Sequence, residues 1–486
     1  MTLTNKKIRR MEKKMKRIIT ALCLVLAIAL NCVALVGCNS GNSNDFELGE
    51  GVTYNGEPVE ITFYHTMGAN LRTVLDKYVA KFNEMYPNIK IVHSQEGGYD
   101  DVRDKISTEL TVGNQPNIAY CYPDHVALYN LAGAVVTLDD FIASTTEVTK
   151  ADGSKEALGF TQAQIDDFID AYYDEGRQFG DGKMYTLPLS KSTEVLYYNK
   201  TFFDANNISV PKTWDELETV CQQILAIDSS CIPLGYDSEA NWFITMCEQL
   251  KSQYTSAEEG NHFLFNNDTN RNFVKRFSEW HNKGYVTTQE IYGAYTSGLF
   301  VAQTGTKSYM SIGSSAGATH QRPTANADGS YPFEVGIATI PQADVNNKKV
   351  ISQGPSLCIF KGEEQEVIAS WLFVKYLTSC VEFQAEFGMA SGYVPVLESV
   401  AQNEIYAGFI NSANGGDNIA ALSAKVCLEQ KDAYYVSPAF NGSSEARDQV
   451  GALLQYCMVQ YKTASDKDAM IKKAFEDAVA ECEYKS

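Results

Sequence analysis

The sequence lacks the local patterns that mark most catalytic and cofactor-binding sites. It contains no His-Glu-x-x-His zinc motif, no phosphate-binding P-loop and no Gly-x-Gly-x-x-Gly dinucleotide turn. The nine cysteines that follow Cys38 form no Cys-x-x-Cys pair, so their spacing indicates neither a zinc site nor a dense disulfide framework. We interpret most of them as buried thiols, with Cys221 and Cys231 as the candidates for a disulfide. Neither a metal nor a cofactor is therefore expected.

Positive charge is scarce outside the first segment of the chain. The 486 residues include 40 Lys and Arg against 60 Asp and Glu, which gives a formal charge of −20. Eight of the basic residues and one acidic residue lie in the first 17 positions, so the chain beyond residue 37 carries −27. A field of this sign repels phosphate backbones, and we expect no nucleic-acid partner.

The N-terminus has the organisation of an export signal. A basic run to Arg17 is followed by an apolar stretch, Ile18 to Val36, which ends at Leu35-Val36-Gly37-Cys38. This end resembles the lipobox of bacterial lipoproteins. The resemblance implies that residues 1–37 are a signal peptide removed before Cys38, and that a diacylglycerol on the Cys38 sulfur anchors the protein to the outer face of the cell membrane. The alternative is a membrane-spanning signal anchor, because the apolar run approaches the spanning length of about 20 residues.

Residues 38–57 are rich in Gly, Asn and Ser and predict a flexible tether. Beyond them, the hydrophobic pattern alternates between the periods of strands and helices. It predicts strand, helix, strand, helix and strand in turn, at residues 59–65, 71–85, 89–94, 100–113 and 117–122. This alternation is typical of a parallel sheet covered by helices on both faces.

A second α/β unit is indicated farther along the chain. The stretch "STEVLYYNK" at residues 192–200 is polar at its start, whereas Val195 to Tyr198 predict a buried strand. Thr213 and Glu216 have the spacing of a capping box at the start of the next helix. Because a chain of 486 residues exceeds what one hydrophobic core usually holds, we expect two or three domains.

Several segments together resemble one family. "FNEMYPNIKIV", "TVGNQPNI", "TLPLSKSTEVLYYNKTFFDANNISVPKTWDEL", "YMSIGSSAG", "VGIATIPQ" and "ASGYVPV" occur in the order found in family 1 extracellular solute-binding proteins of ABC importers, the maltose-binding and glycerol-phosphate-binding group. The resemblance implies a type II periplasmic-binding-protein-like fold, in which two α/β lobes are joined by a multi-strand hinge and enclose a ligand cleft. We expect one lobe from residues 58–191 and 308–353, and the other from residues 192–307 and 354–486.

The resemblance also implies a function. Such a protein is a monomer that binds a small molecule outside the cell and delivers it to the membrane permease subunits of an ABC transporter. Its lobes close by hinge rotation, and the ligand shifts the balance between open and closed forms through contacts made in the closed state.

Candidate ligand contacts follow from side-chain chemistry and from motif matching. Ser192 and Glu194 would lie at the cleft edge, near the crossover between lobes. A sugar site needs aromatic faces and planar polar groups, and Trp242 is the one tryptophan that follows a predicted strand end, so we expect it to stack on the ligand. The alternative for Trp242 is packing in the core. The matching tryptophan contacts ligand in the glycerol-phosphate binder. By the same matching, the contacts include Tyr99, Asp124, Ser192, Ser314, Gly354 and Tyr393. The alternative for the loop positions is a turn residue that satisfies its own backbone.

One departure from the family bears on the substrate. The glycerol-phosphate binder has an arginine in a Gly-Leu-Arg-Leu-Gly stretch, suited to phosphate, whereas this chain has "SPAFNG" there with Ala439 at that position. Arg447, farther on, is a candidate substitute. We therefore expect a carbohydrate, either a sugar or an oligosaccharide, and keep glycerol-3-phosphate or a glycerophosphodiester as the alternative.

Two other classes of protein are disfavoured. Gly313 to Gly317 fit the Gly-x-Ser-x-Gly nucleophile elbow of hydrolases, but the last histidine is His320, five residues after Ser315, and the triad needs one farther downstream. No pair of carboxylates is marked for glycoside hydrolysis, so we expect no enzyme. A surface adhesin would show repeats or Pro/Thr-rich stalks, and the sequence shows neither.

Overall fold

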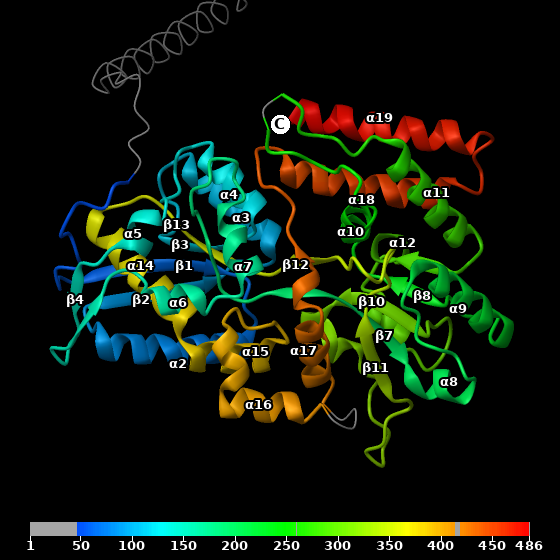
Figure 1. Cartoon of the computed structure of the whole chain (residues 1–486), viewed down its shortest axis with the longest axis horizontal. Coiled ribbons are helices and arrows are strands. Elements are labelled where there is room, and N and C mark those ends of the chain that lie inside the picture. The colour runs from blue at the N-terminus through cyan, green and yellow to red at the C-terminus, as the bar shows by residue number, and fades with distance from the viewer. Residues whose placement is uncertain (1–45, 259, 414–417, 486) are drawn as a thin grey trace, which may run out of the picture. The chain divides into compact units, whose positions relative to one another are not determined.

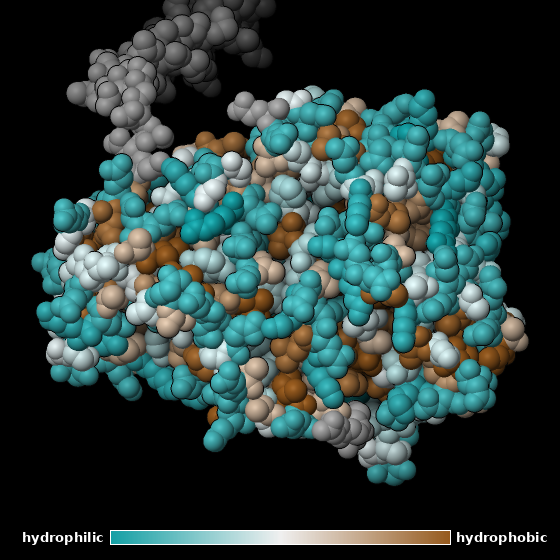
Figure 2. Space-filling model, in the orientation of Figure 1, coloured by the Kyte–Doolittle hydropathy of each residue, from teal (hydrophilic) through white to brown (hydrophobic). Residues whose placement is uncertain are grey.

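The computed structural model describes residues 46–258, 260–413 and 418–485. The predicted signal peptide and the predicted lipidation site, Cys38, lie outside these residues. Within them, no helix is both long and apolar enough to cross a bilayer. Hydrophilic side chains cover most of the face in Figure 2, with smaller hydrophobic areas between them.

The first lobe is built on a five-stranded sheet (Figure 1). The strands are, in order across the sheet, β2 (Ile89–Gln95), β1 (Val59–His65), β3 (Ile118–Cys121), β13 (Ser356–Ile359) and β6 (Leu187–Pro188). β1 is parallel to β2 and β3, which confirms the predicted unit, whereas β13 is antiparallel to both β3 and β6. The period-two pattern of β1 buries Ile61, Phe63 and His65 on one face.

The second lobe is built on a seven-stranded sheet. Six strands lie, in order, as β14 (Tyr434–Tyr435), β12 (Val350–Gln353), β7 (Ser192–Asn199), β10 (Met310–Ser314), β8 (Leu234–Tyr236) and β9 (Val286–Thr288), and β11 (Val335–Thr339) also pairs with β7. β7 is antiparallel to β10, β11 and β12. Its first six residues are buried, so the polar start of "STEVLYYNK" lies inside the protein and not at an open edge.

Helices cover both sheets. Those around the first sheet are α2 (Ala69–Met85), α3 (Tyr99–Leu110), α4 (Pro123–Asn130), α5 (Asp139–Ala143), α6 (Gln162–Asp166), α7 (Asp170–Asp174), α14 (Glu364–Ser379) and α15 (Val381–Ser391). Those around the second sheet are α8 (Lys200–Ala205), α9 (Trp214–Ile227), α10 (Glu239–Gln249), α11 (Asp268–Asn282), α12 (Gln289–Tyr292), α13 (Ser297–Phe300), α17 (Ile419–Glu429), α18 (Ser443–Gln460) and α19 (Lys467–Lys485), and α16 (Glu404–Asn411) lies between α15 and α17.

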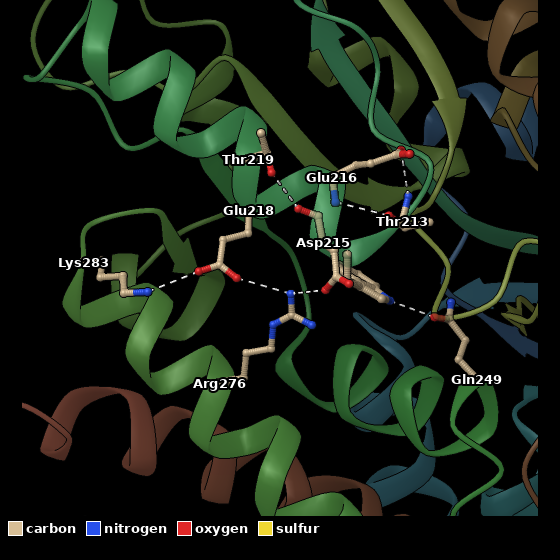
Figure 3. A network of polar contacts seen from close by, with 9 residues as sticks. Thr213, Asp215, Glu216, Glu218, Thr219, Gln249, Arg276 and Lys283 are labelled. Carbon is tan, nitrogen blue, oxygen red and sulfur yellow. Dashed lines mark hydrogen bonds and ion pairs between the residues drawn. The ribbon is translucent and has the colours of Figure 1, made fainter.

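The predicted capping box starts α9. The Thr213 hydroxyl accepts from the Glu216 N–H at 3.2 Å, and the Glu216 carboxylate accepts from the Thr213 N–H at 3.3 Å. Figure 3 shows this cap beside the ion pairs that join α9 to α11, in which Arg276 reaches Asp215 at 2.5 Å and Glu218 at 3.3 Å.

The described residues place the chain in one lobe and then the other at three points, and the predicted boundaries differ from the observed ones. The crossings join β6 to β7, β12 to β13, and α15 to α17. Residues 308–353 were expected in the first lobe, yet β10, β11 and β12 pair in the larger sheet. Residues 354–486 were expected in the second lobe, yet β13 pairs with β3, and α14 and α15 pack on β1 and α2. The cause is strand pairing between distant segments, which local sequence patterns do not encode.

The segment expected to be a flexible tether also differs in part. Residues 46–57 lie against the first lobe, where Phe46 stacks on Phe141 with ring centroids 5.7 Å apart. Gln365 accepts from the Asn55 N–H at 2.9 Å and donates to the Thr53 carbonyl at 3.3 Å. These contacts hold the segment because its Phe, Val and Tyr side chains pack on the core. Residues 38–45 lie outside the described part of the chain.

None of the nine cysteines of the described residues forms a disulfide. Eight are buried, and Cys380 is partly exposed. Cys221 and Cys231, the candidates for a disulfide, are therefore not joined. Burial raises the pKa of most of these thiols, including Cys427, whose pKa rises to about 12, so they are inert packing groups at neutral pH.

Candidate functional site between the lobes

The first two crossings lie side by side at the hinge. The N–H groups of Leu189 and Ser190 donate to the carbonyl of Pro355 at 3.0 and 3.3 Å. Gly354 has a φ of +118°, and a Cβ atom there would lie 2.5 Å from the Ser190 carbonyl oxygen. Only glycine suits this backbone conformation and this close approach. Gly354, predicted as a ligand contact, thus brings the two crossings together.

A buried ion pair ties these crossings to the first lobe. Lys191, 0% exposed, pairs with Glu175, 2% exposed. The Lys191 Nζ also donates to the Ser356 hydroxyl at 3.0 Å and to the Gly354 carbonyl at 3.3 Å. Burial raises the pKa of Glu175, and the Lys191 charge opposes that rise. Such partners are what a buried charge requires.

Glu175 also lines a cavity between the two lobes. The first lobe contributes Tyr122, Pro123 and Asp124, just after the C-terminal end of β3, where parallel sheets place ligands. The second lobe contributes residues of α10, β12, α18 and the loops at 254–255 and 436–438. The cavity volume is about 70 Å³, which is small for a ligand of several heavy atoms.

The lobes touch each other beside this cavity. Arg103 of α3 donates to the Ser444 hydroxyl of α18 at 3.3 Å, and the Ala439 N–H donates to the Gln178 carbonyl at 2.9 Å. This is a closed arrangement. Parting of the lobes, the hinge motion that two-lobe proteins perform, would widen the cavity for a ligand.

Three residues that line the cavity carry an unsatisfied hydroxyl group. The hydroxyls of Tyr254, Thr255 and Ser352 are buried and have no hydrogen-bond partner among the described residues. A buried polar atom without a partner costs about 1–3 kcal/mol, so it is expected to meet water or a ligand. The cavity is therefore suited to a hydroxyl-rich or otherwise polar molecule.

Arg447 adds positive charge to the same cavity. Asn241 and Gln353 exchange two amide hydrogen bonds, at 2.8 and 3.1 Å, and Arg447 donates to the Asn241 Oδ1. Among the described residues, no carboxylate forms an ion pair with Arg447. The remaining guanidinium N–H groups can serve a ligand.

A stack of tyrosines continues the cavity wall in the first lobe. Tyr99 stacks on Tyr122 with ring centroids 4.3 Å apart and an interplanar angle of 18°, and Tyr120 lies behind Tyr99 at 6.4 Å. The Tyr99 and Tyr393 hydroxyls are 3.4 Å apart. Burial raises the pKa of Tyr99 well above its ordinary value, so these rings stay neutral and present apolar faces with polar edges.

Comparisons with known proteins identify the family. A family model described as bacterial extracellular solute-binding protein matches residues 77–411. The chain belongs to this family. As an extracellular solute-binding protein it is a component of an ABC importer that carries a small molecule, and it is not an enzyme.

The relatives of this solute-binding protein include binders of two kinds. The sn-glycerol-3-phosphate-binding periplasmic protein UgpB of Yersinia pestis bv. Antiqua is 25% identical over 371 residues, which cover 74% of this chain and 79% of that protein. The cyclic alpha-maltosyl-1,6-maltose binding protein from Arthrobacter globiformis has a TM-score of 0.65 at 21% identity, over 88% of this chain and 100% of the other. UgpB from Mycobacterium tuberculosis, in complex with glycerophosphocholine, has a TM-score of 0.67 at 16% identity, over 88% and 98%. These likenesses support the two-lobe type II fold.

In this solute-binding protein, Trp242 does not face the cavity. It is 0% exposed, and its ring is stacked between Tyr236 at 4.6 Å and Phe277 at 3.9 Å. Both faces that a sugar ring would need are covered by core aromatics. The expectation of a stacking tryptophan is therefore corrected, because α10 turns this side chain inward toward α11.

The other predicted contacts fall at different depths. Asp124 lines the cavity, and Tyr99 and Tyr393 lie in the adjoining tyrosine cluster. Ser192 and Glu194 are 7% and 2% exposed and are not among the cavity-lining residues, so their expected place at an open cleft edge is corrected. Ser314 is exposed at the end of β10, where its hydroxyl accepts from the Ala316 N–H at 3.2 Å. This contact agrees with the alternative that Ser314 is a turn residue bonded to the local backbone.

Sequence reasoning missed several residues of this cavity. Tyr122 stands two positions before Asp124 in "CYPDH", so the strand-end rule that selected Asp124 could have found it. Gln353 similarly precedes the predicted Gly354. Tyr254 and Ser352 carried no local signal, because only the crossing of distant segments brings them to the cavity.

Proposed function

We propose that this solute-binding protein binds a carbohydrate, either a sugar or an oligosaccharide, in the cavity between its lobes and delivers it to the permease of an ABC importer. The observation that supports this most is that three residues of the cavity lining, Tyr254, Thr255 and Ser352, carry buried hydroxyls without a hydrogen-bond partner among the described residues. A polyol offers donors and acceptors to all three. Asp124 can accept from ligand hydroxyls, and the face of Tyr122 can pack on a sugar ring.

A second candidate ligand is glycerol-3-phosphate or a glycerophosphodiester. Arg447, which has no carboxylate partner among the described residues, supports it, because a guanidinium suits the oxygens of a phosphate. The relatives named for glycerol-3-phosphate binding point the same way. Asp124 and Glu175 in the same cavity weigh against a dianion.

We also propose that the mature protein is a monomer that begins at Cys38 and is held on the outer face of the membrane by a lipid on that residue. Residues 46–57 pack on the first lobe, so such a lipid would tether that lobe through the short stretch before Phe46. Mass spectrometry of the N-terminal peptide tests the lipid directly.

The experiment that separates the ligands is a thermal-shift panel of maltose, maltotriose, sn-glycerol-3-phosphate and glycerophosphocholine. A ligand that binds only the folded form raises the unfolding temperature in a saturable manner. We expect maltose or maltotriose to do so. Stabilisation by the phosphates alone would establish the second candidate, and no stabilisation by any of the four would contradict both.

Arg447→Gln sharpens the distinction. A phosphate ligand should lose about 1.5–3 kcal/mol of binding free energy, because charge-assisted hydrogen bonds disappear. A neutral sugar should lose less. Arg276→Gln is the matched control, since Arg276 of α11 pairs with Asp215 and Glu218 of α9 (Figure 3) and does not line the cavity, so ligand binding should stay unchanged.

A further inference from the structure

Glu194 is a buried carboxyl group with an incomplete set of partners. It is 2% exposed on β7, and its Oε2 accepts from the Tyr236 hydroxyl at 2.6 Å. The other oxygen, Oε1, is buried and has no hydrogen-bond partner among the described residues. A carboxylate in such a place would be poorly solvated, because an ionised group needs several donors or a counter-charge.

The groups that face Glu194 come from every element packed around it. Tyr236 and Asp237 come from the end of β8, Tyr435 from β14, Asn241 from α10 and Arg447 from α18. Burial raises the pKa of Glu194 to about 8, even though Tyr236, Asn241 and Arg447 act in the opposite direction and Asp237 reinforces the rise. The neutral acid is thus the form that fits this environment at pH 7.

The same surroundings connect Glu194 to the ligand cavity. Asn241 exchanges amide hydrogen bonds with Gln353, which lines the cavity, and accepts from Arg447, which also lines it. Arg447 lines the cavity and donates to Asn241, and its positive charge lowers the pKa of Glu194. A negative charge on Glu194 would attract the guanidinium.

We propose that Glu194 is a positioning residue that works as a neutral carboxylic acid beneath the cavity, and that its neutrality keeps Arg447 turned toward the ligand. This inference rests on the proposed function in one respect, namely that a ligand binds in this cavity. Ionisation of Glu194 supplies a buried counter-charge for Arg447, withdraws the guanidinium from the cavity and weakens binding.

Glu194→Gln is the decisive variant, because the amide copies the shape of the neutral acid and cannot ionise. In the wild type, affinity should fall about tenfold between pH 7 and pH 9, as the competent neutral form is depleted above pH 8. The variant should bind as the wild type does at pH 7 and should vary less than twofold up to pH 9. The probes are maltose and sn-glycerol-3-phosphate.

Two measurements without ligand keep this inference separate from the proposed function. Infrared difference spectra should show a protonated carboxylic acid at pH 7 that disappears by pH 9 and is absent from Glu194→Gln. The Nε–H signal of Arg447, assigned with Arg447→Lys, should shift with the same midpoint in the wild type only. If neither probe binds, these spectra still decide the inference while the proposed function fails alone.

Tyr236→Phe provides a second variant should Glu194→Gln fold poorly. Loss of the Tyr236 hydrogen bond removes a group that lowers the pKa of Glu194, so the infrared transition should move to higher pH. Absence of the carboxylic acid band at pH 7 would overturn the inference. An Arg447 signal that does not follow the titration would overturn it as well.

Discussion

At the scale of single residues, the cavity combines side chains that the sequence predicts with others that it does not predict. Asp124 and Tyr99 lie where the ends of parallel strands predict a ligand site, and the structure brings them to the cavity and its tyrosine wall. Trp242 also belongs to a residue type that suits sugar binding. Its orientation depends on whether α10 turns it toward the sheet or the cleft, and residue type does not decide that.

Replacement of Trp242 by alanine tests this distinction. Because the ring is sandwiched between Tyr236 and Phe277, Trp242→Ala should lower the free energy of unfolding by about 3–5 kcal/mol, measured by urea denaturation. The dissociation constant of the folded variant should change less than twofold. Trp242→Phe, which keeps an aromatic ring, should lose less stability. Weakened binding with unchanged stability would return Trp242 to the site.

The titration of Glu194 also has a consequence for stability. Its pKa of about 8 in the folded state lies above the ordinary value of 4.5, so the folded state binds the proton more tightly than the unfolded state. This contribution is complete below pH 4.5, falls by up to about 1.4 kcal/mol per pH unit and is lost above pH 8. The unfolding temperature of the wild type, relative to Glu194→Gln, should therefore decrease from pH 5 to pH 8 and then level off. A constant difference would contradict a buried neutral acid.

At the scale of elements, local signals predicted the first strands and helices well because each carries its own periodicity. β1, α2, β2, α3 and β3 fall within a few residues of their predicted ranges. Residues 162–177 form α6, α7 and a 3₁₀ turn, and Phe168 between α6 and α7 forms a β-bridge with Leu397. The lobe boundaries were predicted less well, since the partners of β10, β11 and β13 are distant in sequence.

The cap of α9 gives a prediction for one helix. Thr213→Ala should cost about 1 kcal/mol of stability, because the Glu216 N–H loses its acceptor. Thr213→Ser should keep most of the stability. Thr219→Ala is the matched control on the same helix: its exposed hydroxyl donates to the Asp215 carbonyl and caps no helix end (Figure 3). Equal losses at positions 213 and 219 would show that the cap contributes nothing.

The hinge gives a second prediction at this scale. Gly354→Ala should lower the free energy of unfolding by more than about 1 kcal/mol, since alanine is strained at positive φ and its methyl group would meet the Ser190 carbonyl. Gly408→Ala in α16 is the control, because a Cβ atom there meets nothing within 4 Å and helix propensity improves. Calorimetry of both variants compares them. A neutral Gly354→Ala would mean that the crossings can separate freely.

At the scale of the whole protein, two lobes close on a polar solute in the proposed function. The contacts of Arg103 with Ser444 and of Gln178 with Ala439 join the lobes, and three residues that line the cavity between the lobes carry unsatisfied hydroxyls. A ligand that contacts both lobes and supplies those hydrogen bonds favours a closed form with room to hold it, and it shifts the balance toward that form. The fold class followed from sequence, whereas the closed contacts depend on tertiary geometry.

Small-angle X-ray scattering with and without ligand tests this claim most directly. The solute that stabilises the protein in the panel of maltose, maltotriose, sn-glycerol-3-phosphate and glycerophosphocholine should reduce the radius of gyration, and it should be recovered chemically unchanged. A non-stabilising member of the panel should leave the scattering profile as it was. A profile that is identical with every member of the panel, or conversion of any of them into another compound, would contradict the account.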